Sequence, residues 1–393
     1  MAARKLRFID LFAGAGGLSE GLREAGYAAL YANELEPEYA RTYRRNHPGT
    51  PVETADIRTI DAARIRSELG LKRGELDLLA GGPPCQGFSI NAPVRSVSDS
   101  RNHLFRDFLR FAEEFSPRAV LIENVPGLVS FSGGATLRAI LDSLGSLGYR
   151  SDVAVLCAPW YRLSQTRWRT FVLGLKGGEA PGPAFPEPGL SCPARPNFAC
   201  SFEGRPILKL PGPKAVPGRV TVREAIGDLP PLSNGERGAP VKGYASAPLN
   251  AYQERARAGS SGVLNHEAPR LSKINMERMA LVAPGGNWKD IPDYLLPLGM
   301  RRASRSDHTK RYGRVEPDGL ASTVLTKCDP HWGAYFHYDQ ERVFTVREAA
   351  RIQSFPDRFA FGGTQTRQFA QVGNAVPPLL AMAVGVALEK SLK

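Results

Sequence analysis

Residues 6–17, LRFIDLFAGAGG, decide the fold of this protein. The apolar run LRFIDLF is typical of a buried strand, and AGAGG predicts a tight turn because glycine reaches backbone conformations that other residues avoid. Leu18, Leu22 and Ala25 then recur at helical spacing. A strand, a glycine turn and a helix form a nucleotide-binding unit in which the N-terminus of the helix faces the ligand.

The glycine turn alone leaves the kind of nucleotide open. AGAGG lacks the full G-x-G-x-x-G spacing of dinucleotide sites, which counts against NAD. A second predicted strand, residues 28–32, ends at Asn33 and Glu34. An acidic residue at that point usually holds a ribose diol, whereas the alternative for Glu34 is a solvated loop carboxylate.

Strands and helices continue to alternate along the first half of the chain. Helices are predicted near residues 37–46, 60–69, 105–112 and 137–147. Strands are predicted near residue 52 and at residues 76–80, 119–122, 153–156 and 171–173. This alternation predicts an α/β protein with a doubly wound, mostly parallel sheet.

A second motif, GGPPCQGFS at residues 81–89, follows one of these strands. Its glycines and prolines predict a stiff loop at the carboxyl end of the strand, where ligands bind in open α/β sheets. Cys85 is thereby a candidate nucleophile, although a turn that happens to hold a cysteine is the alternative. The polar residues 90–103 predict a loop.

Two further regions contribute candidate catalytic groups. Glu123 follows the strand at 119–122, and Gln165, Arg167 and Arg169 precede the strand at 171–173. A cysteine beside arginines has a lowered pKa, and a partly buried glutamate can donate a proton. The alternatives are a helix-cap or ion-paired carboxylate for Glu123 and an exposed face or strand edge for the arginines.

Composition narrows the class of protein. The chain has 393 residues, enough for two domains, and a net charge of +12 that favours a polyanionic partner. We expect no membrane-spanning segment, because no apolar run approaches the necessary length. The five cysteines form no CxxC pair, which favours neither a zinc site nor a disulfide framework and makes a reducing cytosol the simplest compartment.

The composition of the chain changes near residue 176, where prolines and glycines mark a boundary and the alternation of strands and helices stops. Thr221 and Thr345 each begin a Thr-x-x-Glu capping box that predicts a helix start. A basic run between them is typical of a surface that touches phosphates and base edges, with a solvated loop as the alternative. It contains Arg301, Arg302, Arg305, Lys310, Arg311 and Arg314, interleaved with Asp307, His308 and Tyr312.

These motifs together resemble those of the DNA (cytosine-5)-methyltransferases of bacterial restriction–modification or orphan systems. The matching segments occur in the family's order over nearly the whole chain, at residues 8–17, 33–34, 56–57, 82–89, 123–125, 165–169 and 371–377. The resemblance implies a Rossmann-like, S-adenosylmethionine-dependent fold with an inserted smaller domain. We expect a catalytic domain at 1–178, a target-recognition domain at 179–344, and a C-terminal segment at 345–393 that returns to the catalytic domain.

The resemblance also implies an activity: methylation of cytosine C5 within a short specific sequence of double-stranded DNA. Cys85 would add transiently to C6 of a flipped-out base, because a base inside a duplex cannot be reached. Glu123 would protonate or hydrogen-bond N3, and Arg167 and Arg169 would orient the base and stabilise the developing charge. The loop after Ser89 would close over the base.

The remaining site residues are also carried over from the resemblance, which implies no metal. Pro84 would line the cofactor site and, with Asn124, shape the pocket around the base. The residues expected to bind S-adenosylmethionine are Asp10, Phe12, Ala13, Gly14, Gly16, Gly17, Glu34, Asp56, Ile57, Pro84 and Asn374. Those expected to contact DNA are Gln86, Ser89, Asn124, Arg301, Arg302 and Arg305.

We expect a cytoplasmic bacterial monomer whose partners are double-stranded DNA and a cognate restriction endonuclease that acts on the same site. Three alternatives stay open. The first is a tRNA cytosine-5 methyltransferase on the same fold, against which the long basic segment argues. The others are a non-catalytic DNA-binding relative and a nucleotide-dependent oxidoreductase that uses the glycine turn.

Overall fold

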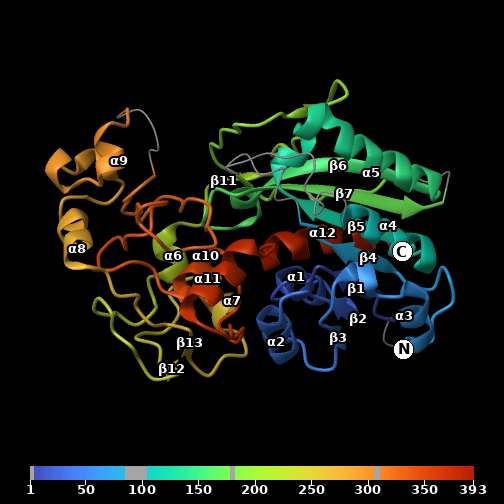
Figure 1. Ribbon diagram of the computed structural model, residues 1–393, viewed down its shortest axis with the longest axis horizontal. Coiled ribbons are helices and arrows are strands. Elements are labelled where there is room, and N and C mark those ends of the chain that lie inside the picture. Colours follow the sequence, from blue (N-terminus) through green and yellow to red (C-terminus); the bar gives the residue numbers. More distant parts are fainter. Residues whose placement is uncertain (1–3, 85–103, 178–181, 305–309) are drawn as a thin grey trace. The chain divides into compact units, whose positions relative to one another are not determined.

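A computed structural model describes residues 4–84, 104–177, 182–304 and 310–393 (Figure 1). The chain divides into two compact units. The first comprises Met1–Tyr161, Trp168–Pro217 and Val376–Lys393, and the second comprises Arg162–Arg167 and Gly218–Ala375. The chain thus leaves the first unit after residue 217 and returns to it at Val376, whereas the predicted functional domains meet at 178/179 and 344/345.

A seven-stranded sheet with the order β3-β2-β1-β4-β5-β7-β6 forms the centre of the first unit (Figure 1). Its strands are β1 (Arg7–Leu11), β2 (Ala28–Asn33), β3 (Val52–Glu53), β4 (Leu78–Gly81), β5 (Ala119–Asn124), β6 (Tyr149–Cys157) and β7 (Trp168–Lys176). All neighbouring pairs from β3 to β5 are parallel. β7 is antiparallel to β5 and to β6. The predicted doubly wound, mostly parallel sheet is confirmed.

Two groups of helices flank this sheet. They are α1 (Gly17–Glu24), α2 (Pro37–Asn46), α3 (Ala62–Glu68), α4 (Leu104–Phe115), α5 (Ala135–Ser146) and the C-terminal α12 (Pro378–Leu392). α1 packs against α12, whereas α4 contacts both α3 and α5. Because helices cover both faces, the central strands β4 and β5 are buried along their whole length, as is usual for parallel strands.

Short elements complete the first unit. Its short strands are β8 (Leu190–Ser191), β9 (Ser201–Phe202), β10 (Arg205–Pro206) and β11 (Val216–Pro217). Single turns of 3-10 helix are η1 (Ile57–Thr59), η3 (Pro126–Val129), η4 (Phe131–Gly134) and η5 (Ala158–Tyr161). The predicted helices and strands of this unit are all present, and α2 begins and ends at the predicted residues.

The second unit has little regular structure. It contains α6 (Val222–Ile226), α7 (Ala251–Arg257), α8 (Lys273–Ala280), α9 (Leu298–Arg301), α10 (Val346–Ile352), α11 (Gln365–Asn374), η6 (Trp288–Asp290), η7 (Asp293–Leu295) and the antiparallel pair β12 (Val241–Lys242) and β13 (Val263–Leu264). Both predicted capping boxes are confirmed: Thr221 and Thr345 cap α6 and α10.

Buried arginines supply many of the contacts inside the second unit. Arg351 is fully buried and pairs with Asp357 (2.6 Å) and Asp228 (3.0 Å). Arg347 donates to the backbone oxygens of Pro356 (3.0 Å) and Phe359 (2.6 Å). Carbonyl groups that lie outside helices and sheets still need partners when buried, and these guanidinium groups provide them.

The expectation that no apolar run reaches the length of a membrane span needs one correction. The helical stretch Gln365–Leu392 is long and apolar enough to cross a membrane by length and composition. However, 67% of its most apolar window is buried inside the protein. A core helix passes the same test, because burial in protein and burial in lipid select similar side chains.

Gly21 lets α1 and α12 pack at close range. A Cβ atom at this position would lie 2.2 Å from the backbone oxygen of Pro378 and 2.5 Å from the Cβ of Ala381. The Tyr27 hydroxyl donates to the backbone oxygen of Gly385 at 3.0 Å and ties the same two parts of the chain together. The close packing of α1 against α12 therefore depends on the absence of a side chain at Gly21.

We predict that Gly21→Ala lowers the free energy of unfolding by about 1–3 kcal/mol, because the added methyl group overpacks a contact with rigid backbone. Gly145→Ala is the matched control: Gly145 also lies in a helix, α5, but a Cβ there meets nothing within 4 Å. It should leave stability unchanged or raise it slightly through helix propensity. Urea denaturation measures both, and equal effects of the two substitutions would contradict the packing argument.

Candidate functional site

Four parallel strands of the first unit bring predicted site residues to one edge of the sheet. Phe12 follows β1, Glu34 follows β2, and Pro83 follows β4, while Glu123 and Asn124 close β5. Because β2, β1, β4 and β5 are neighbours and run in the same direction, their carboxyl ends meet there. The motifs at residues 8–17, 33–34, 82–84 and 123–125 thus share one edge.

The glycine turn is bound to the end of β2. The backbone N–H of Gly14 donates to Glu34 Oε2 at 2.7 Å, and the N–H of Ala13 donates to the backbone oxygen of Asn33 at 2.9 Å. The N–H of Glu36 donates to the other carboxylate oxygen of Glu34 at 2.8 Å. Burial raises the pKa of Glu34, and these backbone hydrogen bonds counteract that effect.

Phe12 has a backbone conformation that is rare for a residue with a side chain. Its φ is 58°, in the left-handed region, and the residue is only partly buried. Such strain costs on the order of 1–3 kcal/mol and is concentrated at functional sites. Beside it, a Cβ on Gly14 would meet nothing within 4 Å. The open side of the turn therefore offers an aromatic ring, free space and the carboxylate of Glu34.

A buried polar network lies beneath this turn. The Ser19 hydroxyl donates to Asp10 Oδ2 at 2.6 Å and lies 2.7 Å from the Tyr43 hydroxyl. Asp10 has no exposed surface. Burial raises its pKa to about 7, with the charge of Glu34 adding to the effect and the Ser19 hydrogen bond opposing it. Asp10 thus acts on the turn from below, through Ser19 at the start of α1.

His47 completes the support of the turn and was missed by the sequence analysis. Arg23 Nη1 lies 2.8 Å from His47 Nδ1, and His47 Nε2 lies 3.2 Å from the backbone oxygen of Gly16. Since arginine can only donate, Nδ1 accepts and Nε2–H donates. Gly16 permits this approach, because a Cβ there would be 2.4 Å from Nε2. The four-residue spacing from Tyr43, which predicts a shared helix face, was the available signal.

Asp56 and Ile57 lie after β3. Asp56 accepts from the N–H of Arg58 at 3.0 Å and caps η1, and its carboxylate pairs with the Arg58 side chain at 2.5 Å. The hydrogen bonds from Arg58 lower the pKa of Asp56. Ile57 is buried. The apolar side chain of Ile57 and the ionised carboxylate of Asp56 are thus adjacent just after β3, the edge strand of the sheet.

A buried ion pair stands where β4 and β5 end. Glu123 Oε1 lies 2.7 Å from Arg169 Nε, and the two side chains are 11% and 13% exposed. A Cβ on Gly82 would lie 3.2 Å from Glu123 Oε2, so the carboxylate sits against the backbone that leads to Cys85. Asn124 Nδ2 donates to the backbone oxygen of Pro83 at 3.1 Å and holds the same segment. Desolvation lowers the pKa of Arg169, and the charge of Glu123 opposes that shift.

Several predicted site residues lie outside the described residues: Cys85, Gln86, Ser89 and Arg305, together with the loop at 90–103. Pro84 is the last described residue before this gap and is partly buried.

Arg167 and Asn374 belong to the second unit. Arg167 is 1% exposed and donates to the backbone oxygens of Val324 (3.1 Å), Gly373 (2.8 Å) and Ala375 (3.1 Å). Asn374 is exposed at the end of α11. Arg167 and Arg169 were predicted to act together on the base, but they have different surroundings. Arg167 binds carbonyl groups, and Arg169 binds a carboxylate.

The basic run of the second unit also separates into different environments. Arg314 donates to the backbone oxygens of Val282 (2.7 Å) and Met279 (2.8 Å). Arg301 donates to those of Leu296 and Tyr294, both at 3.1 Å. Arg302 is exposed. Two of these guanidinium groups thus hold loops in place.

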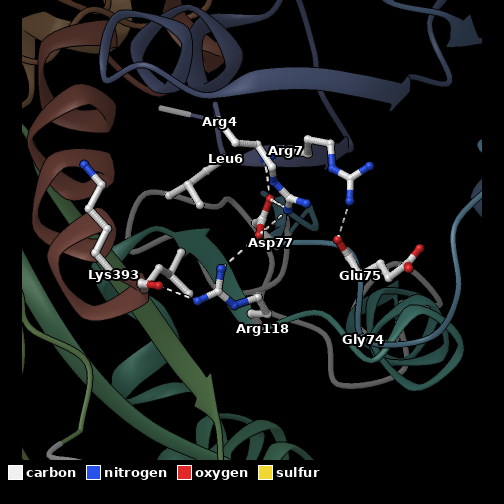
Figure 2. Close-up of a pocket in the computed structure, with 9 residues that line it drawn as sticks. Arg4, Leu6, Arg7, Gly74, Glu75, Asp77, Arg118 and Lys393 are labelled. Atoms are coloured by element: carbon white, nitrogen blue, oxygen red, sulfur yellow. Dashed lines mark hydrogen bonds and ion pairs between the residues drawn. The ribbon is translucent and has the colours of Figure 1, made fainter. Parts of the chain in front are cut away.

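A hollow of about 750 Å³ lies at the other edge of the sheet, where β1, β4 and β5 begin (Figure 2). Asp77 occupies its centre and pairs with Arg4 (2.9 Å) and Arg118 (3.0 Å), and Arg7 donates to the backbone oxygen of Glu75 (2.8 Å). These contacts tie the start of the chain to β4 and β5. None of the predicted site residues lines the hollow.

Among the residues that the structure describes, no group of three or more His, Cys, Asp or Glu side chains is arranged to hold a metal ion. The carboxyl edge itself carries the Glu123–Arg169 ion pair and, at the glycine turn, Phe12 and Glu34.

The model of the C-5 cytosine-specific DNA methylase family matches residues 6–390. The chain belongs to this family. It is 37% identical to the type II methyltransferase M.AgeI of Thalassovita gelatinovora, over 98% of this chain and all of that protein. It is 35% identical to the type II methyltransferase M.DdeI of Desulfomicrobium norvegicum, over 96% of this chain and 87% of that protein. The predicted DNA (cytosine-5)-methyltransferase family is confirmed.

Solved structures of low sequence identity share the fold of this methylase. An E. coli prophage protein assigned as a DNA modification methyltransferase superposes with a TM-score of 0.74 at 24% identity, over 98% of this chain and 99% of that one. A mutant of Spodoptera frugiperda DNMT2 gives 0.58 at 15% identity, over 99% of both chains. The methyltransferase fold is therefore common to sequences that differ at most positions.

We predict that Asp10 makes the stability of the ligand-free methylase depend on pH. Its raised pKa means that the folded protein holds the proton more tightly, so its contribution is fully present below about pH 4 and is lost as the pH rises through about 7. The loss is on the order of 4 kcal/mol. Asp10→Asn should remove this slope in urea denaturation between pH 4.5 and 8. Asp152→Asn, at an exposed position in β6, should retain it, and an unchanged slope in Asp10→Asn would contradict the assignment.

Proposed function

We propose that this protein methylates C5 of cytosine within a short specific sequence of double-stranded DNA. The observation that carries the proposal is the Glu123–Arg169 ion pair, which lies against Gly82 directly ahead of the Pro83-Pro84-Cys85 segment, in a member of the cytosine-specific methylase family. A buried ion pair at the end of a strand is a poor source of stability, whereas charged groups of this kind are common where catalysis needs them.

The proposed chemistry begins with Cys85. Its thiolate forms a bond to C6 of the cytosine, and the electron pair displaced through the ring moves to N3, which accepts a hydrogen bond or a proton from Glu123. C5 becomes nucleophilic and would take the methyl group as the bond between that methyl group and the sulfonium sulfur of S-adenosylmethionine breaks, while N3 returns any proton to Glu123. Loss of the C5 proton to a base then allows the bond between Cys85 and C6 to break, which restores the aromatic ring and the thiolate.

Arg169 supports this sequence through Glu123. Its guanidinium group lies at the carboxylate and stabilises negative charge in a site that excludes most water. Asn124 holds the backbone of Pro83, two residues before Cys85 in the sequence. For Arg167 the contacts with three backbone oxygens of the second unit favour a structural role, although the family resemblance implies one at the base.

The residues at the carboxyl edge fit S-adenosyl-L-methionine. The partly buried ring of Phe12 suits an adenine, the carboxylate of Glu34 suits the ribose hydroxyls, and the space in front of Gly14 leaves room for the remainder. Asp56 and Ile57 would hold the adenine edge, and Asn374 the methionyl group. This cofactor supplies an electrophilic methyl group and leaves as S-adenosyl-L-homocysteine. Asp10, fully buried, would position the turn rather than touch the cofactor.

The second unit is the proposed target-recognition part. It holds the basic run at residues 301–314, and the chain carries a net charge of +12, which favours DNA phosphates. A base inside a duplex has to be flipped out before Cys85 can reach C6. We further propose that the protein acts as a cytoplasmic monomer, with a restriction endonuclease of the same specificity as the partner enzyme.

Bisulfite sequencing of plasmid DNA from cells that express this protein tests the proposed activity. We expect protected cytosines within one short sequence. Cys85→Ala should remove the protection and lower methyl transfer in vitro by at least about a thousandfold, because the nucleophile is lost. Its affinity for S-adenosylmethionine, measured by calorimetry, should stay within about twofold, since no step of cofactor binding needs the thiol.

Cys200→Ala is the matched control. Cys200 is a partly buried free cysteine outside every motif, so its loss should leave the pattern of protected cytosines unchanged. Protection that persists in Cys85→Ala would overturn the nucleophile assignment. Protection absent from the wild-type protein would overturn the choice of DNA as substrate, and incorporation of labelled methyl groups into tRNA would then identify the alternative.

Glu34→Gln tests the cofactor cradle. We expect the affinity for S-adenosylmethionine to fall by about tenfold, because a neutral amide is a weaker acceptor for ribose hydroxyls and for the N–H of Gly14. Glu53→Gln is the control: this carboxylate at the end of β3 pairs with Arg64 on the surface at 2.8 Å. Calorimetric titration measures both, and equal affinities for the two variants would contradict the role of Glu34.

A further inference from the structure

Trp332 is unusual among the four tryptophans of the chain, all of which the structure describes. Trp160, Trp168 and Trp288 are 3%, 8% and 0% exposed, whereas Trp332 is 55% exposed. A tryptophan ring stabilises a protein chiefly when its large apolar surface is buried. An exposed tryptophan is therefore often a contact for a partner.

Neighbouring side chains of the second unit hold this ring in place. The guanidinium carbon of Arg311 lies 4.9 Å from the ring centroid of Trp332, over its face. The His331 ring meets the Trp332 ring edge to face, at 4.9 Å and 84°. The backbone N–H of Trp332 donates to the backbone oxygen of Asp329 at 2.9 Å, which closes the turn beneath the ring. The exposed ring is therefore braced on two sides.

The ring contacts that support Trp332 continue into the interior of the second unit. His331 stacks edge to face on Tyr312, with centroids 5.8 Å apart, and Tyr312 is only 3% exposed. The guanidinium carbon of Arg278 lies 5.2 Å from the Tyr312 ring centroid. Tyr312 has a φ of 48°, a left-handed conformation that is costly for a residue with a bulky side chain. Three rings, Tyr312, His331 and Trp332, thus follow one another from the interior to the surface, with a guanidinium group over the first and over the last.

Stability alone gives a weak account of this arrangement. A cation–π contact at an exposed site contributes only about 0.5–1 kcal/mol. Arg301 and Arg314, from the same basic run, instead bind backbone oxygens and hold loops. A flat aromatic face in water beside a guanidinium group matches nucleic acid, because bases and sugars pack on the ring and phosphates pair with the cation.

We propose that Trp332, braced by Arg311, is a DNA contact of the second unit, in which the indole packs against a base or sugar and Arg311 pairs with the adjacent phosphate. The inference rests on the proposed action on DNA and adds a residue that the basic run did not include. Lys327 is exposed in the same segment and adds a further positive charge for the backbone.

Tryptophan fluorescence tests this contact directly, because the other three indoles are buried. Acrylamide should quench mainly Trp332 in the free protein. Addition of sheared plasmid duplex DNA at low salt should lower the quenching constant at least twofold. Trp332→Phe should abolish both the quenchable fraction and its response to DNA, while melting by circular dichroism confirms that the variant is folded.

Fluorescence anisotropy with a labelled duplex gives the second measurement. Trp332→Ala and Arg311→Ala should each weaken binding at least fivefold, and Arg311→Ala should also flatten the salt dependence. Tyr294→Ala is the matched control, because this ring is 74% exposed in the same unit but belongs to another segment. Its affinity should stay within twofold. All variants should bind S-adenosylmethionine like the wild-type protein.

The outcomes separate this inference from the proposed function. If the wild-type protein binds duplex DNA while the quenching of Trp332 is unchanged, the contact is refuted and the methylation proposal stands. If DNA neither binds nor becomes methylated, both fail. Shielding of Trp332 that depends on protein concentration without DNA would assign the surface to a second copy of the chain and would also refute the contact.

Discussion

The ion pair between Glu123 and Arg169 depends on the one reversed strand of the sheet. β7 begins at Trp168 and runs antiparallel to β5, so the start of β7 lies beside the end of β5, with Asn124 opposite Thr170. A parallel β7 would carry Arg169 to the other edge, away from Glu123 and from the backbone at Gly82. The reversal thus adds a cation to an edge that the parallel strands already supply with a carboxylate and the segment before Cys85.

The glycine turn on the same edge is held from both sides. Glu34 binds it at the end of β2, and Ser19, Asp10, Tyr43 and His47 support it from within. Ser19, Asp10, Tyr43 and His47 have no exposed surface, so these four groups support the shape of the turn from within the protein. A preorganised turn loses less freedom when a ligand binds, which is a general source of affinity.

The two compact units solve the problem of buried polar groups differently. The first pairs its backbone in a sheet flanked by helices, and two of these, α1 and α12, pack closely because Gly21 has no side chain. The second has few regular elements and relies on buried guanidinium groups such as Arg347, Arg351 and Arg167, which bind carbonyl oxygens and carboxylates. An irregular scaffold of this kind can present side chains such as Trp332 from loops, where surface chemistry is free to vary.

The sequence by itself determined the local structure: the strand and helix order, the bounds of α2, the helix starts at Thr221 and Thr345 and the family, because periodicity, capping and glycine turns act between near neighbours. Only the tertiary structure decided which of two similar arginines meets Glu123, that His47 supports Gly16, and that Arg311 lies over Trp332. These contacts join residues from separate elements, and no local pattern encodes them. Contacts between residues so far apart in the sequence follow from strand direction and packing, which exist only once the chain has folded.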